Sequence, residues 1–158
     1  MSKHCRTSRR SLLVALGASA ATLLTFRANA APAVLVHKDP NCGCCTGWAA
    51  HMRKAGFEVT IDERSDLTAV RRRLGVPDEL AACHTAEIDG YVVEGHVPAE
   101  AVQRLLRERP AATGLSVPGM PPGSPGMESP TPETYEVLLF GKSGKQPFMR
   151  FLETKAIG

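Results

Sequence analysis

Three cysteines fall within four residues, at Cys42, Cys44 and Cys45, and a fourth follows well downstream at Cys83. A buried structural cysteine needs no neighbour of its own kind, so packing alone does not explain such a cluster. Thiols this close together bind a soft metal ion, carry out thiol–disulfide chemistry, or do both. The fold of this chain must therefore hold these thiols in a geometry that supports metal binding or thiol–disulfide chemistry.

The segments around the cluster alternate between strand-like and helix-like patterns. Short β-branched or alternating runs predict strands, and apolar positions at helical spacing predict helices. Asp89-Gly90, between two strand-like runs, predicts a tight hairpin. The predicted elements are a strand at 34–37, a helix at 46–56, a strand at 57–61, a helix at 67–74, paired strands at 84–88 and 91–94, and a helix at 98–107.

This order places the thiol motif between the first strand and the helix that follows it. A β-α-β-α-β-β-α order with such a motif is the thioredoxin-like arrangement, so we predict an α/β fold of that class. The first cysteines then lie at a helix N-terminus, whose N–H groups and dipole stabilise thiolate. Residues 111–134 are rich in glycine and proline and predict a long loop. Residues 135–140 and 148–152 predict a β-hairpin extension at the C-terminal end.

Residues 1–30 are typical of a cleaved export signal peptide. Basic residues precede an apolar stretch at 11–25, and Ala28-Asn29-Ala30 is a small-residue cleavage site. We expect a mature chain of residues 31–158 that forms a single thioredoxin-like metal-binding domain. The apolar stretch is too short for a good membrane span, so no membrane segment is expected in the mature form. Arg9-Arg10 fits a twin-arginine signal, but paired arginines also occur in ordinary secretory signals, and both export routes stay open.

The expected signal also carries the positive charge of the chain. The full sequence has 19 basic and 16 acidic residues, and five of the basic ones lie in residues 1–30, which contain no acidic residue. The mature chain therefore has 14 basic and 16 acidic residues and a net charge of about −2. This balance predicts no nucleic-acid surface.

Three chemistries compete for the cysteines. In an oxidising compartment they could form two structural disulfides, but Cys44–Cys45 would close a strained ring and other bridges within the motif constrain little of the unfolded chain. Cys42 and Cys45 have the spacing of a dithiol oxidoreductase, but a third adjacent thiol would scramble its disulfide. Three thiolates at one turn suit Cu(I) or Zn(II), and zinc would prefer a second such motif or a histidine pair. The pattern therefore favours metal binding.

Cys83 and two methionines are further candidate ligands. Cys83 precedes the predicted third strand, a point that faces the first motif in a thioredoxin-like fold, so it can complete a four-thiolate site. Met120 and Met127 lie in the glycine- and proline-rich segment, and thioethers are soft ligands for Cu(I), although packing beneath the loop is an equal interpretation. Thiolates can bridge ions, so more than one copper is compatible with the cluster. His37, His51 and His96 are interpreted as structural or solvent-facing, and His84 as either a surface residue or one that supports a ligand.

Several motifs beyond the cysteines form a distinctive set. They are Cys42-Gly43-Cys44-Cys45 with Trp48, Cys83-His84-Thr85, Gly90-Tyr91, Glu94-Gly95-His96-Val97-Pro98, and Gly114-Leu115 through Pro125-Gly126-Met127-Glu128. The set resembles the DUF411 family, which includes periplasmic copper-resistance proteins. The resemblance implies a thioredoxin-like fold, a periplasmic location and copper binding through the three-cysteine motif and Cys83. It also implies a role in copper handling or resistance, and it leaves Cu(I)/Cu(II) redox activity open.

Three functions follow from these observations. The favoured one is a periplasmic protein that holds copper as Cu(I) and whose partners are copper ions and other periplasmic copper-handling proteins. The second is a thiol–disulfide oxidoreductase that uses Cys42 and Cys45; it lacks the proline that thioredoxins carry before the third strand. The third is a copper metallochaperone. Whether the chain is an enzyme, such as a copper oxidoreductase, or a carrier is not decided by the sequence.

Overall fold

The computed structural model describes residues 31–158, so the expected export signal at 1–30 lies outside the described residues. The elements begin and end as follows: β1 Ala33–Lys38, α1 Gly43–Lys54, β2 Glu58–Glu63, α2 Thr68–Leu74, a 3-10 turn η1 Asp78–Leu80, β3 His84–Ile88, β4 Tyr91–Gly95, α3 Ala99–Glu108, β5 Gly114–Val117, β6 Thr134–Gly141, β7 Gly144–Leu152 and β8 Lys155–Ala156. Within these residues, no helix is long and apolar enough to cross a membrane.

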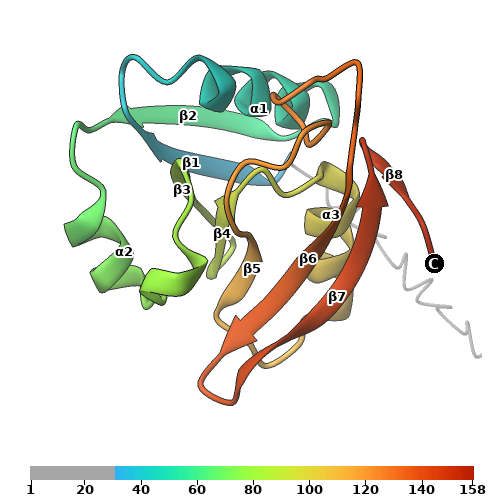
Figure 1. The fold of residues 1–158 in the computed structure, drawn as a ribbon. Coiled ribbons are helices and arrows are strands. Elements are labelled where there is room, and N and C mark those ends of the chain that lie inside the picture. The colour runs from blue at the N-terminus through green and yellow to red at the C-terminus, as the bar shows by residue number, and fades with distance from the viewer. Residues whose placement is uncertain (1–30) are drawn as a thin grey trace, which may run out of the picture.

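The strands form one mixed sheet in the order β2-β1-β3-β4-β5-β6-β7-β8 (Figure 1). Strands β1 and β2 pair in parallel, β3 is antiparallel to both β1 and β4, and β4 and β5 are parallel. The hairpin β6–β7 continues the sheet beyond β5. The predicted α/β class, the order of the first seven elements and the C-terminal hairpin are confirmed.

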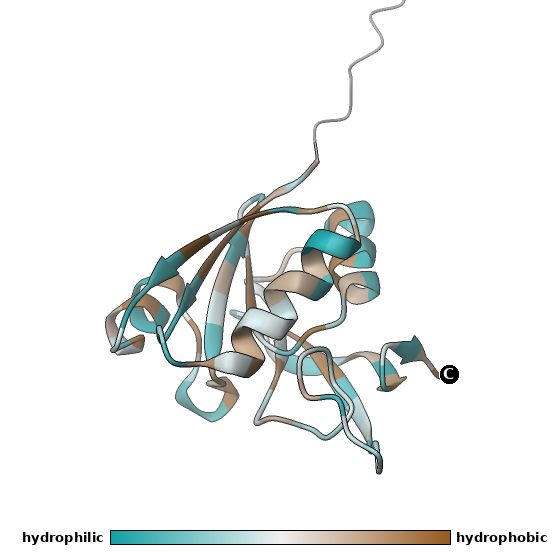
Figure 2. Cartoon of the chain, turned by 90° about the horizontal axis from the view of Figure 1, so that it is seen from above, coloured by the Kyte–Doolittle hydropathy of each residue, from teal (hydrophilic) through white to brown (hydrophobic). Residues whose placement is uncertain are grey.

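The core lies between the sheet and the helices α1 and α3. Helix α1 buries Trp48 and Met52, and α3 buries Val102 and Leu105. The Trp48 indole N–H also donates a hydrogen bond of 2.8 Å to the backbone oxygen of Val97, which satisfies its one polar atom. Figure 2 shows β1 and β2 with hydrophobic centres and hydrophilic carboxyl ends. Polar residues therefore gather at the end of β1 that leads to the thiol motif.

Local sequence rules account for the turns that place the site. Asp89 and Gly90 both have positive φ, at 49° and 84°, as the two central residues of a type I′ hairpin turn require. Helix α1 begins at Gly43 with Cys42 as its N-cap, three residues earlier than predicted. Cys44 and Cys45 therefore lie inside the first helical turn.

The prediction of an uninterrupted loop over 111–134 is wrong at its start. Strand β5 occupies 114–117 and pairs with β4 on one side and β6 on the other. All four of its residues are buried, and a Cβ at Gly114 would lie only 1.8 Å from the Val92 backbone oxygen. Glycine is typical of loops in sequence, but at position 114 it is required by the close approach of two strands.

The remaining segment, 118–133, returns over the N-terminal half of α1. Gly126 has φ of 85°, and a Cβ there would lie 2.3 Å from the Cys44 backbone oxygen and 2.7 Å from the Trp48 backbone nitrogen. Across this contact, a Cβ at Gly47 would lie 2.9 Å from the Gly126 Cα. Two glycines therefore let the loop backbone touch the helix that carries the thiol motif.

Replacing Gly126 with alanine is expected to destabilise the protein by about 2–3 kcal/mol, because the new methyl group meets backbone atoms that cannot move aside. Gly119 is the matched control: its φ is also positive, at 73°, but no atom lies within 4 Å of a Cβ built there. Gly119→Ala is expected to cost only about 1 kcal/mol of backbone strain. Urea unfolding measures both; equal losses would contradict the importance of the loop–helix contact.

Candidate metal centre

A tight turn after β1 places the thiol motif at the N-terminus of α1. The Asp39 backbone oxygen accepts a hydrogen bond of 3.0 Å from the Cys42 N–H, and the Asp39 carboxylate accepts one of 2.8 Å from the Asn41 N–H. These bonds hold residues 39–42 in a turn that ends at the helix N-cap. The motif thus lies at the positive end of the helix dipole, where thiolate is stabilised.

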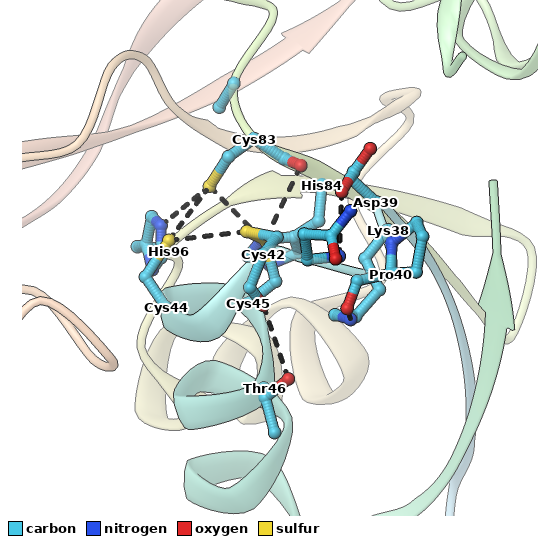
Figure 3. Close-up of a disulfide and its surroundings, with 12 residues drawn as sticks. Lys38, Asp39, Pro40, Cys42, Cys44, Cys45, Thr46, Cys83, His84 and His96 are labelled. Atoms are coloured by element: carbon cyan, nitrogen blue, oxygen red, sulfur yellow. Dashed lines mark hydrogen bonds between the residues drawn. A yellow bond between two sulfur atoms is a disulfide. The ribbon is translucent and has the colours of Figure 1, made fainter. Parts of the chain in front are cut away.

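The four cysteine sulfurs lie together, all within 4.8 Å of one another (Figure 3). Cys42 and Cys45 are joined by a disulfide with their Cα atoms 5.4 Å apart. Cys44 and Cys83 are free thiols. The Cys44 sulfur lies 3.4 Å from the Cys42 sulfur and 3.9 Å from the Cys83 sulfur. The predicted meeting of Cys83 with the 42–45 motif is therefore present in the fold.

His96 is a site residue that sequence reasoning missed. It is fully buried, and its Nδ1 lies 2.8 Å from the Pro125 backbone oxygen. Because a carbonyl oxygen can only accept, Nδ1 carries the proton, and the Nε2 lone pair faces the Cys83 sulfur at 2.8 Å. Burial lowers the pKa of His96, which favours this neutral form. An imidazole whose outer nitrogen is fixed by a carbonyl is oriented as metal-binding histidines are.

His84 is also buried, so of its two interpretations the surface position is wrong. It begins β3, a strand with neighbours on both sides, and its ring centre lies 4.4 Å from that of Trp48 and 5.1 Å from that of His96. Burial holds its pKa well below the usual value. Its Nδ1 lies 3.6 Å from the Cys83 sulfur, while Nε2 has no hydrogen-bond partner within residues 31–158.

Histidines 37 and 51 have structural contacts, as predicted. His37 is 3% exposed, and its two nitrogens lie 2.8 Å from the carboxylates of Asp62 and Glu87. His51 accepts a hydrogen bond of 3.0 Å from the Ala99 N–H at the start of α3. Neither belongs to a group of candidate ligands in the part of the chain that the structure describes.

A buried carboxylate positions the segment that carries Cys83. Glu94 accepts hydrogen bonds from the Arg71 guanidinium at 2.9 Å, the Ala82 N–H at 2.7 Å and the Thr85 hydroxyl at 2.6 Å. Arg71 also donates to the Ala82 backbone oxygen. Burial raises the pKa of Glu94, although all three contacts suit the ionised form and oppose that rise. The residue before Cys83 is thus held at both its N–H and its C=O.

The thiol of Cys83 is itself kept protonated by its surroundings. Burial, together with the neighbouring Cys44 thiol, raises the pKa of Cys83 to about 12. A bound cation would reverse this, because a thiol that coordinates a metal is deprotonated. Binding of a soft metal ion at Cys83 therefore requires release of the thiol proton.

The two methionines of the loop differ in exposure. Met120 is 54% exposed, whereas Met127 is partly buried and directly follows Gly126, the residue that contacts α1. A role for either thioether as a ligand stays a prediction.

Two groups of candidate ligand residues share one sulfur. The first contains the four cysteines, and the second contains Cys83, His84 and His96; within each group the ligand atoms lie within 4.8 Å of one another. Cys83 belongs to both. The arrangement offers soft sulfur and nitrogen donors from the N-terminus of α1, from the residue that follows β4 and from the residues at the start of β3.

Comparisons with known proteins found a matching family model and matching solved structures. Residues 80–127 match the family model described as "Protein of unknown function, DUF411". A solved structure of a copper resistance protein CopG, form 1, is 46% identical, with a TM-score of 0.71, covering 75% of this chain and 96% of that chain. Form 2 is 44% identical, with a TM-score of 0.70, covering 81% of this chain and 99% of that chain. No curated protein matches.

Proposed function

The chain belongs to the DUF411 family of CopG-like proteins, and on that premise we propose that it binds copper through Cys42, Cys44, Cys45 and Cys83. The observation that carries the proposal is the set of four sulfurs within 4.8 Å at a helix N-terminus. Thiolates are the donors that copper prefers as Cu(I), so Cu(I) is the form that this centre holds. Copper is then the cargo of the protein.

The shared position of Cys83 supports a site for more than one copper ion. A thiolate can bridge two ions, and Cys83 contacts Cys44 on one side and His96 on the other. We add His96 to the proposed ligands, because its Nε2 lone pair already points at the Cys83 sulfur. The Cys42–Cys45 disulfide engages two of the four thiols, so the form that binds most copper is the reduced one.

A thiol–disulfide oxidoreductase is the second candidate function. The observation in its favour is the Cys42–Cys45 disulfide, which has C-x-x-C spacing and lies at the N-terminus of α1. The order of elements and the sheet order β2-β1-β3-β4 support a thioredoxin-like fold for residues 33–108. Reduction of insulin by metal-free protein, at a rate that Cys42→Ser removes, would favour this function over copper binding.

The proposed setting is the periplasm, with residues 1–30 as a cleaved export signal and 31–158 as one metal-binding domain. The protein would act there in copper handling or resistance, alongside other copper-handling proteins. A metallochaperone role would in addition require transfer of copper to an acceptor. Detection of the protein in the periplasmic fraction, with Ala31 as its first residue by N-terminal sequencing, tests the setting.

Metal analysis tests the central proposal. Protein purified without chelator from copper-supplemented cells is expected to contain at least one copper per chain, with thiols that become reactive only after the copper is removed. The measurement is elemental analysis with a parallel thiol count. Absence of copper together with two disulfides would contradict copper binding and favour the redox or structural alternatives.

The methionines give a further test of the centre. Met127→Leu is expected to weaken Cu(I) binding about tenfold, because Met127 adjoins the contact between the loop and Cys44, and leucine has the volume of methionine without the sulfur. Met120→Leu is the matched control and is expected to have a smaller effect, since Met120 is largely exposed. Competition with a Cu(I) chelator measures both. Two variants that bind like the unaltered protein would exclude thioether ligation.

A further inference from the structure

Lys38 is a buried cation without a close counter-charge. Its side chain is 2% exposed, and its ammonium donates a hydrogen bond of 3.4 Å to the Pro40 backbone oxygen. Within residues 31–158, the carboxylate oxygen nearest to its Nζ belongs to Glu63, at 3.9 Å, and that side chain is 60% exposed to solvent. A charge taken out of water costs free energy unless a partner offsets it. The fold therefore keeps inside the protein a positive charge that its own contacts offset only weakly.

The strand register places this cation beside the thiol motif. Lys38 lies opposite His84 in the antiparallel pair of β1 and β3, and opposite residues project to the same face of a sheet. On that face the His84 ring lies 4.4 Å from the ring of Trp48, and its Nδ1 lies 3.6 Å from the Cys83 sulfur. The Lys38 ammonium contacts the turn that leads to Cys42, and Figure 3 shows Lys38 among the surroundings of the disulfide. The charge thus lies next to the proposed copper centre without being one of its donors.

We propose that Lys38 is a specificity-determining residue that favours the monovalent ion Cu(I) over divalent soft ions such as Zn(II) at this centre. The inference rests on the proposed copper function and adds a means of telling apart two ions that both bind sulfur. The donors alone do not exclude zinc, because thiolate and imidazole are ligands for Cu(I) and Zn(II) alike. A fixed charge next to the donors separates the two ions by their ionic charge.

The charge of the loaded centre decides the direction of the effect. An ion of charge z that displaces n thiol protons changes the charge of the centre by z − n. With the same thiolates, bound Zn(II) therefore leaves the centre one unit more positive than bound Cu(I) does. The Lys38 ammonium repels that additional unit, and its burial limits screening of the repulsion by water and salt.

Lys38 differs in this respect from the other cation held near the centre. The Arg71 guanidinium lies 2.9 Å from the fully buried carboxylate of Glu94, which offsets its charge. Lys38 is the only lysine or arginine that is buried in the part of the chain that the structure describes. A residue that costs stability and has no strong contact of its own is typical of a functional site.

The test compares two affinities of reduced, metal-free, full-length protein that carries Cys5→Ser, so that the four site cysteines are the only thiols. Competition with a Cu(I) chelator and, separately, with a Zn(II) chelator gives the two dissociation constants, both measured anaerobically at one pH. Lys38→Met retains the length of the side chain and removes its charge. We expect the ratio of Zn(II) affinity to Cu(I) affinity to rise about tenfold in this variant.

Three further variants isolate the charge. Lys38→Arg retains the charge and is expected to keep the affinity ratio of the unaltered protein. Lys38→Gln is a second neutral variant, which keeps a donor for the Pro40 carbonyl and is expected to behave as Lys38→Met does. Lys54→Met is the matched control, because Lys54 is exposed at the other end of α1 and its loss changes the net charge equally. This control is expected to leave the ratio unchanged.

A stability measurement separates selection from a structural role. Metal-free Lys38→Met protein is expected to unfold at the same or a higher urea concentration than the unaltered protein, because a weakly paired buried charge has been removed. A residue that only supported the fold would instead lower that concentration on replacement and weaken the binding of both ions by the same factor.

The outcomes for the inference and for the proposed function are distinct. An unchanged affinity ratio in both neutral variants at position 38 would overturn the inference and leave copper binding in place. An equal change of the ratio in Lys54→Met would also overturn it, because the effect would then follow the net charge of the protein. Failure of the unaltered protein to bind Cu(I) would defeat the proposed function together with the inference.

Discussion

Replacing Cys83 with serine is expected to abolish tight copper binding, with affinity for Cu(I) falling by more than about 100-fold. Cys83 is the one residue shared by both groups of candidate ligands. Its sulfur lies 3.9 Å from that of Cys44 and 2.8 Å from His96 Nε2, so its loss removes a donor from each group. Serine keeps the size of the side chain but replaces a soft donor with a hard one. Competition titration with a Cu(I) chelator measures the change.

Two comparisons make this prediction specific. Cys44→Ser is also expected to abolish tight binding, because it removes one of the two thiols that are free beside the disulfide. Thr46→Ser is the matched control: the residue is exposed in the same helical turn, its hydroxyl contacts the Cys42 backbone oxygen, and serine retains that hydroxyl. Unchanged copper stoichiometry in Cys83→Ser protein, with a normal circular dichroism spectrum, would disprove the proposed centre.

Replacing Glu94 with alanine is expected to destabilise the protein by about 3 kcal/mol, a loss of roughly 10 °C in melting temperature. The Glu94 side chain is fully buried and accepts from Arg71, Ala82 and Thr85. Alanine leaves a partly buried guanidinium, a backbone N–H and a hydroxyl without their acceptor. Copper affinity is expected to fall as well, because Ala82 precedes Cys83. Urea unfolding and copper titration measure the two effects.

Glu94→Gln is the control for charge. One amide oxygen can still accept from Arg71 and Ala82, and the amide nitrogen can donate to the Thr85 hydroxyl. We therefore expect glutamine to retain most of the stability that alanine loses. Equal destabilisation by the two changes would show that the negative charge, rather than the three hydrogen bonds, holds this segment.

The outline of the fold was accessible from local patterns. Alternating runs, helical spacing and the Asp89-Gly90 turn predicted the first seven elements, because each pattern expresses contacts within a few residues. Strand β5 was not predicted, since Gly114 has turn-like composition and becomes a strand residue only between β4 and β6. Arg71 lies in a run of three arginines, yet it pairs with Glu94, 23 residues away in sequence, a contact that no local pattern indicates.

The sequence by itself determined the thiol cluster, its place between the first strand and helix, and its preference for a soft ion, because spacing and residue chemistry are local properties. Only the tertiary structure decided which side chains join the cluster. His96 lies 13 residues from Cys83 and shows no ligand spacing, but the pairing of β3 with β4 brings the two within 2.8 Å. The burial of His84 and the role of Glu94 likewise depend on strand order and register. Such contacts across a sheet leave no periodic signal in the sequence.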